Sequence, residues 1–96
     1  MEKNFYVYIL ASKRNGTLYV GVTSNLPQRM YQHKNGLFKG FSKKYNVKRL
    51  VYFEQHRDGV GALTREKQLK KWKRLWKINL IEKNNPDWND LYGSLF

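Results

Sequence analysis

A hairpin signal near the N-terminus constrains the fold of this chain more than any other feature. Two runs rich in aromatic and β-branched residues, Phe5 to Ala11 and Leu18 to Thr23, flank a segment that contains Asn15 and Gly16. Both residues of that pair tolerate the positive φ that tight hairpin turns require. We therefore expect the chain to begin with two antiparallel strands.

The register of this hairpin follows if Asn15 and Gly16 are its two turn residues. In that register Tyr8 lies opposite Thr23, and Tyr8 and Tyr19 share one face because strand side chains alternate. We expect the tyrosine face to be available for chemistry and the other face to pack under a helix. That second face carries an almost wholly apolar set: Phe5, Val7, Ile9, Leu18, Val20 and Val22.

A helix, a loop and a third strand are expected next. Asn25 is an acceptable N-cap, Gly36 stops the helix, and the predicted buried stripe is Leu26, Met30 and Leu37. The basic and aromatic segment from Gly36 to Asn46 predicts an exposed loop. The run from Val47 to Gln55 predicts a strand, and a turn follows at Asp58 and Gly59.

Helical spacing dominates from Val60 to Asn84, with a break expected near Lys73 and an end at Pro86. The predicted apolar stripe is Ala62, Leu69, Trp72, Trp76 and Leu80. With 96 residues, the chain is long enough for one core only. We expect a single α+β domain over 1–96, with a core of about 5–81 and an aromatic tail, 84–96, that folds back on it.

The charge of the chain favours nucleic acid as a partner. Nineteen Lys or Arg against seven Asp or Glu leave a net charge of +12, and a field of that sign attracts polyanions. Better solubility and an anionic membrane are the alternatives, but the tryptophans of the lysine-rich segment from Arg65 to Lys77 are better explained by a core. The absence of cysteine and of a signal peptide favours a cytoplasmic protein without a disulfide framework, a thiolate zinc site or a membrane span.

Glu66 breaks the apolar pattern of its helix. On a helical wheel it falls inside the stripe, where an unpaired carboxylate would cost several kcal/mol. Lys70, Lys73 or a hydrated edge of the stripe could compensate the charge. The functional alternative is a metal ligand, because a carboxylate at the rim of a groove suits Mg²⁺ or Mn²⁺.

Five further residues are candidates for a site on the tyrosine face. Arg29 projects close enough to that face to bind phosphate oxygens in bidentate fashion, although most arginines of basic proteins are only solvated. His33, one turn later, is either a core histidine or a proton carrier. Tyr8 and Tyr19 could be ordinary strand residues, and only their shared face sets them apart. Gly21, two residues after Tyr19, is a strand glycine typical of a close approach by a ligand or another backbone.

The motifs YVY, YVG, NLPQR and TREKQLKKW, in this order and spacing, resemble the GIY-YIG nuclease superfamily, and particularly its small stand-alone UPF0213 group. The resemblance runs from Phe5 to about Ile81. It implies a three-stranded antiparallel sheet flanked by helices, and an endonuclease that hydrolyses phosphodiester bonds with one divalent metal, Mg²⁺ or Mn²⁺. DNA is the expected substrate in preference to RNA, possible roles being repair or recombination. A non-catalytic nucleic-acid-binding module on the same scaffold is the alternative.

The resemblance also implies a role for each matched position. Tyr8 and Tyr19 match the two motif tyrosines, Arg29 the catalytic arginine, and Glu66 the metal-binding glutamate. His33 matches a position where similar proteins often carry histidine. The sequence departs from the pattern at Tyr6, which replaces the first glycine, and only Asn79 stands near the place of an asparagine that some related nucleases carry.

A basic loop region is expected to contact nucleic acid, unless it is merely solvated. Aromatic residues lie between its cations, which are Lys39, Lys43, Lys44, Lys48 and Arg49. The chain has no additional recognition domain, so targeting would depend on a partner protein or on the shape of the nucleic acid.

Overall fold

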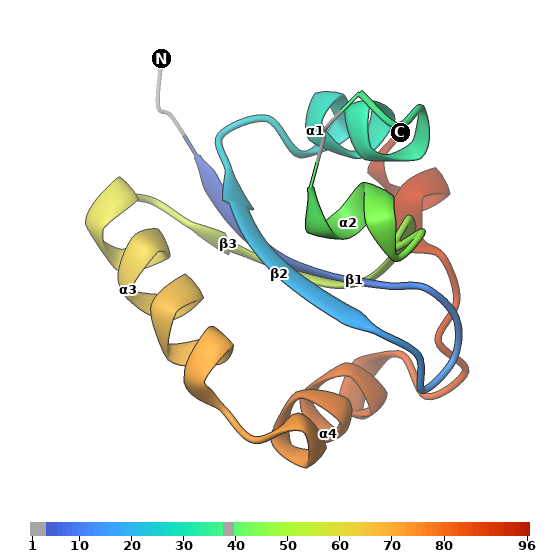
Figure 1. Cartoon of the computed structure of the whole chain (residues 1–96). Helices are drawn as coiled ribbons and strands as arrows, with labels where there is room; N and C mark the ends of the chain where they lie inside the picture. Colours follow the sequence, from blue (N-terminus) through green and yellow to red (C-terminus); the bar gives the residue numbers. More distant parts are fainter. Residues whose placement is uncertain (1–3, 38–39) are drawn as a thin grey trace.

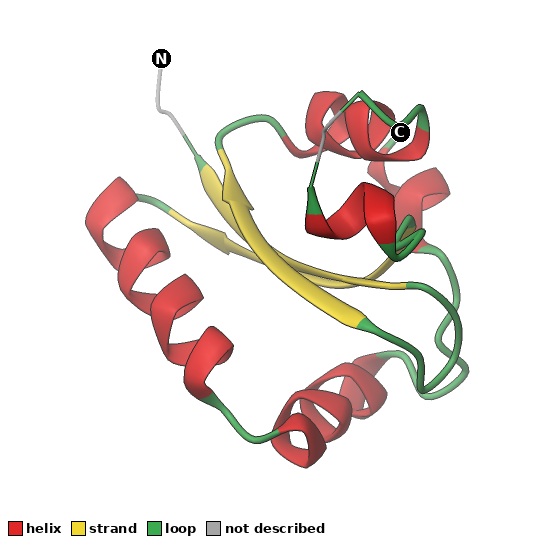
Figure 2. Cartoon of the chain, viewed as in Figure 1, coloured by secondary structure: helices red, strands yellow, loops and turns green. Residues whose placement is uncertain are grey.

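The computed structural model describes residues 4–37 and 40–96, without the side chains of residues 41 and 42. Its described part contains one antiparallel sheet in the order β2-β1-β3. The strands are β1 (Phe5–Ala11), β2 (Leu18–Thr23) and β3 (Arg49–His56). Both outer strands pair with β1, which leaves β2 as an edge strand (Figure 2). The predicted α+β fold with a three-stranded antiparallel sheet is confirmed.

Five helical segments surround the sheet (Figure 1). They are α1 (Leu26–Lys34), α2 (Phe41–Lys44), α3 (Gly59–Lys71), α4 (Arg74–Asn84) and the 3₁₀ segment η1 (Leu91–Leu95). Helices α3 and α4 lie on one side of the sheet, and α1, α2 and the C-terminal segment lie on the other. No helix in the described ranges has the length and apolar character needed to cross a bilayer.

The predicted hairpin is present, but its register differs from the prediction by two residues. Tyr8 pairs with Gly21 rather than Thr23, and the ladder continues until the Ser12 amide donates to the Thr17 carbonyl at 3.0 Å. The turn therefore comprises residues 13–16, and Asn15 adopts the positive φ of 56°. A shift of two residues preserves the alternation of side chains, so the two tyrosines still share a face.

Both faces of the sheet are buried, which corrects the expectation that the tyrosine face is open. The aliphatic face joins residues of α3 and α4 in one cluster, to which Trp88 also belongs. The tyrosine face joins α1 in a second cluster of Tyr8, Leu10, Leu26, Met30, Val47 and Leu50. Residues of η1 pack against that second cluster. Any chemistry on this face must therefore occur at its margin.

Helix α1 begins as predicted, because the Asn25 side chain accepts a hydrogen bond from the Gln28 amide. The helix ends at Lys34, and Gly36 beyond it has a φ of 65°. The predicted burial of Leu37 is wrong, since it lies past the helix end and is 63% exposed. His33 takes its place in the buried stripe.

The predicted break near Lys73 separates α3 from α4. Trp72 and Lys73 both have a ψ of 147°, which is outside the helical range. The break changes the direction of the chain, and Trp76 beyond it is 51% exposed, contrary to the prediction. Leu80, the last residue of the predicted stripe, still packs against the core cluster. Asp58 is part of a helix start rather than a free turn, because its side chain caps α3 at the Gly61 amide.

The segment between α1 and β3 is not wholly a loop, since α2 interrupts it. Lys39 and the neighbouring Phe38 lie outside the described residues. The aromatic tail folds back as expected: Trp88 is fully buried, and its indole Nε1 donates to Glu82 at 2.7 Å. Asn85, also buried, donates to the Val51 carbonyl at 3.1 Å and so ties the start of the tail to β3.

Candidate active site

Tyr8 of β1 and His33 of α1 form the buried centre of the candidate site. Tyr8 is 0% exposed, His33 is 5% exposed, and the Tyr8 hydroxyl lies 3.1 Å from His33 Nε2. Tyr19 of β2 completes a cluster of three rings, with centroids 6.3 Å from Tyr8 and 5.5 Å from His33. Tyr19 is only partly buried, so it is the ring of the three that is most open to solvent.

Gly21 makes room for the Tyr8 ring. A Cβ added to Gly21 would lie 2.4 Å from both Cζ and Oη of Tyr8, a separation that real Cβ atoms do not adopt. The sequence correctly indicated a close approach at this glycine. The approaching group is the side chain of its cross-strand neighbour rather than a ligand or another backbone.

Arg29 lies on α1, one turn before His33, and is partly buried. Its guanidinium hydrogen-bonds Tyr8, and its charge acts on both Tyr8 and His33. The structure thus brings Arg29 to the margin of the ring cluster. A cation held beside phenols at such a margin can bind an anionic oxygen.

Glu66 reaches the site from α3, on the other side of the sheet. Its side chain is 14% exposed, and its charge still acts on the Tyr8 hydroxyl. Lys70 Nζ lies 3.5 Å from Glu66 Oε1, so one of the two lysines considered from sequence is a partner. Because the Lys70 side chain is 53% exposed, this (i, i+4) pair contributes little and can open to water.

Burial perturbs the titration of two site groups in opposite ways. Burial raises the pKa of the Tyr8 hydroxyl well above its ordinary value, and the charges of Tyr19 and Glu66 raise it further. The charge and hydrogen bond of Arg29 act against that rise. Burial, followed by the Arg29 charge, lowers the pKa of His33 to about 4. At neutral pH the centre therefore holds a protonated phenol and an uncharged imidazole.

The remaining candidates lie away from this centre or have structural contacts. Asn79 is exposed on α4. Lys43 and Lys44 are exposed on α2, and Lys44 stands 5.4 Å from the Tyr45 ring centroid. Lys48 is partly buried, and Arg49 donates to the Trp88 carbonyl at 3.1 Å. Arg49 therefore helps to hold the tail.

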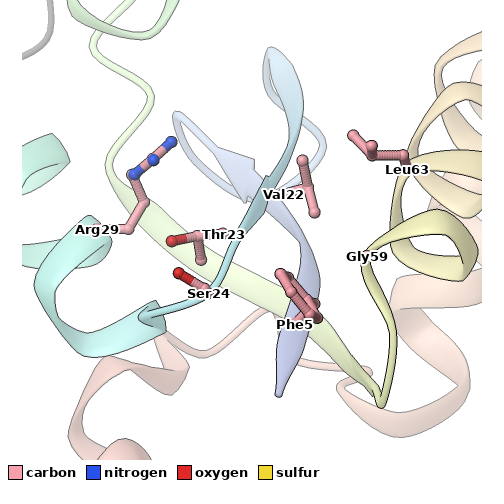
Figure 3. Close-up of a pocket in the computed structure, with 7 residues that line it drawn as sticks. All are labelled: Phe5, Val22, Thr23, Ser24, Arg29, Gly59 and Leu63. Atoms are coloured by element: carbon pink, nitrogen blue, oxygen red, sulfur yellow. The ribbon is translucent and has the colours of Figure 1, made fainter. Parts of the chain in front are cut away.

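Sequence reasoning missed a groove that crosses the edge strand beside Arg29 (Figure 3). Arg29 borders it from α1, and Leu63 borders it from α3. The other lining residues are Phe5, Val22, Thr23, Ser24 and Gly59. The sequence signal was weak, because these residues come from separate elements and three of the seven belong to strand patterns.

Residues 4–79 match the GIY-YIG catalytic domain family. The chain belongs to the GIY-YIG family. A UPF0213 protein of Syntrophus aciditrophicus is 40% identical over 88 residues, which cover 91% of this chain and 98% of that protein. Another, from Clostridium perfringens, is 40% identical over 76 residues, covering 79% and 81% of the two chains. The predicted resemblance to small GIY-YIG proteins of the UPF0213 group is confirmed.

A solved structure supports the same assignment. The solution NMR structure of a UPF0213 protein from Bacillus halodurans has a TM-score of 0.56 and 25% sequence identity. The alignment covers 91% of this chain and 92% of that one. This GIY-YIG chain therefore belongs to a nuclease superfamily whose members generally use a divalent metal.

The side chains of this GIY-YIG domain that could ligate a metal are few, and they suit a metal that needs only one protein carboxylate. Among the residues that the structure describes, no three His, Cys, Asp or Glu side chains gather in one place. Glu66 is a single, partly accessible carboxylate. Mg²⁺ is commonly held by one or two carboxylates together with substrate phosphates and water, so Glu66 fits a metal that arrives with a nucleic acid.

Proposed function

We propose that this protein is a divalent-metal-dependent endonuclease that hydrolyses phosphodiester bonds in DNA. The observation that carries the proposal is that Tyr19, Arg29 and Glu66, which come from three different elements, all act electrostatically on the Tyr8 hydroxyl of a fourth. The electrostatic environment of the Tyr8 hydroxyl includes Tyr19, Arg29 and Glu66. Membership of the GIY-YIG family and the net charge of +12 support a nucleic acid substrate.

Arg29 and Glu66 take the electrostatic roles. Arg29 would bind nonbridging oxygens of the scissile phosphate and stabilise the charge that develops on them. Glu66 would hold Mg²⁺ or Mn²⁺, and a bound metal supplies Lewis-acid polarisation of the phosphate and the leaving 3′ oxygen. The Lys70 side chain that pairs with Glu66 is 53% exposed, so it can move aside and leave the Glu66 carboxylate accessible for this role.

Tyr19 is our choice for the phenol that faces the attacking water. Tyr8 is wholly covered and its raised pKa keeps it protonated, whereas Tyr19 is partly accessible. When the proton of uncharged His33 is on Nδ1, its Nε2 accepts a hydrogen bond from the Tyr8 hydroxyl. The Tyr19 ring packs edge-on against the His33 ring of this hydrogen-bonded pair. A phenol accepts a proton only as phenolate, so this role requires the ionised form of the Tyr19 hydroxyl.

Exposed lysines of α2, and the cations at the start of β3, would interact with the phosphates that flank the scissile one. Lys43 and Lys44 are the accessible candidates, and Lys48 and Arg49 would contribute mainly through their charge. We assign no activity to Asn79 or Lys39. A partner protein for targeting and a role in repair or recombination remain part of the proposal.

A non-catalytic nucleic-acid-binding module is the second candidate. It is favoured by the sparse donor set, since no three His, Cys, Asp or Glu side chains gather in one place within residues 4–37 and 40–96. An adaptor that uses the C-terminal aromatic residues is less favoured than either. Trp88 is buried, and Leu91, Tyr92 and Leu95 pack against the second core cluster, so these side chains are occupied by the fold.

A cleavage assay separates the first two candidates. Supercoiled plasmid and branched, nicked and single-stranded oligonucleotides are incubated with Mg²⁺ or Mn²⁺. Wild type is compared with Arg29→Ala and Glu66→Gln, and with two matched controls at exposed positions, Arg57→Ala and Asp87→Asn. Cleavage by wild type and both controls, but by neither site variant, is expected. Binding by every protein with cleavage by none would establish the binding module instead.

A further inference from the structure

The groove at the edge strand has two chemically different sides (Figure 3). Arg29 and Ser24 border it on the α1 side, where Ser24 is exposed. Phe5, Val22 and Leu63 make the other side apolar. Leu63 is 49% exposed, so its side chain is accessible to a molecule in the groove.

The apolar side is held in place by the fold. Phe5 packs against the core cluster under α3, and a Cβ at Gly59 would lie 3.6 Å from the Phe5 ring, so the ring stands against the first turn of α3. Thr23 also lines the groove, and its side chain is held in place because its hydroxyl accepts a hydrogen bond from the Asn25 amide at 3.1 Å. The groove is therefore a formed surface rather than a gap between mobile side chains.

A nucleotide has the same division of chemistry, with an anionic phosphate at one end and a flat, weakly polar base at the other. We propose that this groove seats the nucleotide next to the scissile phosphate, with its phosphate at Arg29 and its base between Phe5 and Leu63. This inference rests on the proposed nuclease function and adds a subsite to it. Arg29 supplies the charge complementarity, and none of the residues that line the groove is acidic.

The subsite selects for nucleic acid structure. A base reaches Phe5 and Leu63 only after it leaves the helical stack, and unstacking costs least where the base is already unpaired. Stacking on a protein ring contributes about 1–3 kcal/mol per base and depends little on sequence. Flaps, branch points and single strands are therefore preferred over intact duplex, without a preferred base.

NMR titration with the dinucleotide d(TpT), in the absence of metal, tests the subsite independently of cleavage. In wild type we expect saturable amide shifts centred on Val22, Ser24 and Gly59. Leu63→Ala removes one wall, and Phe5→Leu removes the ring while it keeps a branched apolar side chain against the core. Each is expected to raise the Kd of d(TpT) by about tenfold, which corresponds to the lower half of the stacking range.

Val60→Ala is the matched control, because Val60 is 77% exposed on the same helix and does not line the groove. It is expected to leave the Kd unchanged. Amide spectra of each variant establish that the fold is retained. Leu63 is exposed whereas Phe5 packs against the core, so at least one of the two variants is expected to fold normally. On a flap substrate, the kcat/KM of Leu63→Ala and Phe5→Leu should fall by about tenfold, and by less on a nicked duplex.

The outcomes distinguish this inference from the function on which it rests. Amide shifts of groove residues on addition of d(TpT), lost in both variants, support the subsite even if wild type cleaves nothing. Absence of cleavage in that case would contradict only the nuclease function. Cleavage by wild type with no saturable shifts in the groove overturns the subsite alone. Shifts that centre on exposed Trp76 of α4, or an unchanged Kd in both variants, also overturn it.

Discussion

Lowering the pH from 7 to 5 is expected to destabilise the protein through His33. Burial and the Arg29 charge lower the pKa of His33 from 6.5 to about 4 in the folded chain. The unfolded chain therefore binds a proton on this residue more readily than the folded chain does. Stability from this source is fully present above pH 6.5 and is lost progressively as the pH falls towards 4.

The size of the effect follows from the two pKa values. Between pH 7 and pH 5, linkage predicts a loss of about 2 kcal/mol in the free energy of unfolding. Aspartates and glutamates with ordinary pKa values remain largely ionised at pH 5, so they contribute little in this window. The lowered pKa of Asp90 removes that carboxyl from it as well, since the hydrogen bond from Lys34 outweighs burial.

Urea denaturation at the two pH values measures this loss. His33→Gln keeps a side-chain acceptor for the Tyr8 hydroxyl but does not titrate, so its stability should differ by less than about 0.5 kcal/mol between pH 7 and pH 5. His56→Gln is the control, because His33 and His56 are the only two histidines of the sequence. A wild-type loss equal to that of His33→Gln, or its disappearance in His56→Gln, would refute the reasoning.

Three further results are expected. Gly21→Ala should lose about 1–3 kcal/mol in urea denaturation, because its Cβ would overlap the buried Tyr8 ring, and an unchanged midpoint would contradict that packing. Asn85→Ala should cost about 1–3 kcal/mol by thermal unfolding, because the Val51 carbonyl loses its donor; a smaller change would mean that water replaces the amide. Lys70→Gln should change stability by less than about 0.5 kcal/mol and retain cleavage, whereas Glu66→Gln should lose cleavage. Loss of cleavage in Lys70→Gln would show that the ion pair itself is needed to position Glu66.

The hairpin illustrates what the sequence could and could not predict. The alternation of side chains along a strand has a fixed period, so the shared face of Tyr8 and Tyr19 followed directly from their positions. The register did not, because it depends on how many residues close the turn. Of the predicted pair only Asn15 takes the positive φ, and pairing stops at Ser12 and Thr17, so the turn contains four residues rather than two.

Helical stripes failed where the helix itself ended. Leu37 and Trp76 were placed by extending a regular period past Lys34 in one case and past Lys73 in the other, and both side chains are exposed. The two errors share one cause, since a helical wheel has meaning only within a continuous helix. Caps and breaks were better predicted than burial, because Asn25 acts through its own backbone neighbours.

The candidate site needed the structure in a different way. Sequence alone left His33 as either a core histidine or a proton carrier, and in the fold it is buried and also touches the Tyr8 hydroxyl. Glu66 approaches from the opposite side of the sheet, which no local spacing could specify. Its distance in sequence from Arg29 is bridged only by the topology that places α1 and α3 on either side of β2 (Figure 1).

Single-turnover cleavage of a flap substrate by wild type and Arg29→Ala, with the Kd measured on the same substrate, tests the central claim most directly. Loss of one preorganised charge-stabilising donor is expected to slow cleavage by about a hundredfold or more. The Kd should change by less than about threefold, because the many other cations maintain binding. Cleavage that is unchanged, or that falls only in proportion to binding, would contradict the assignment of Arg29 to the reacting phosphate.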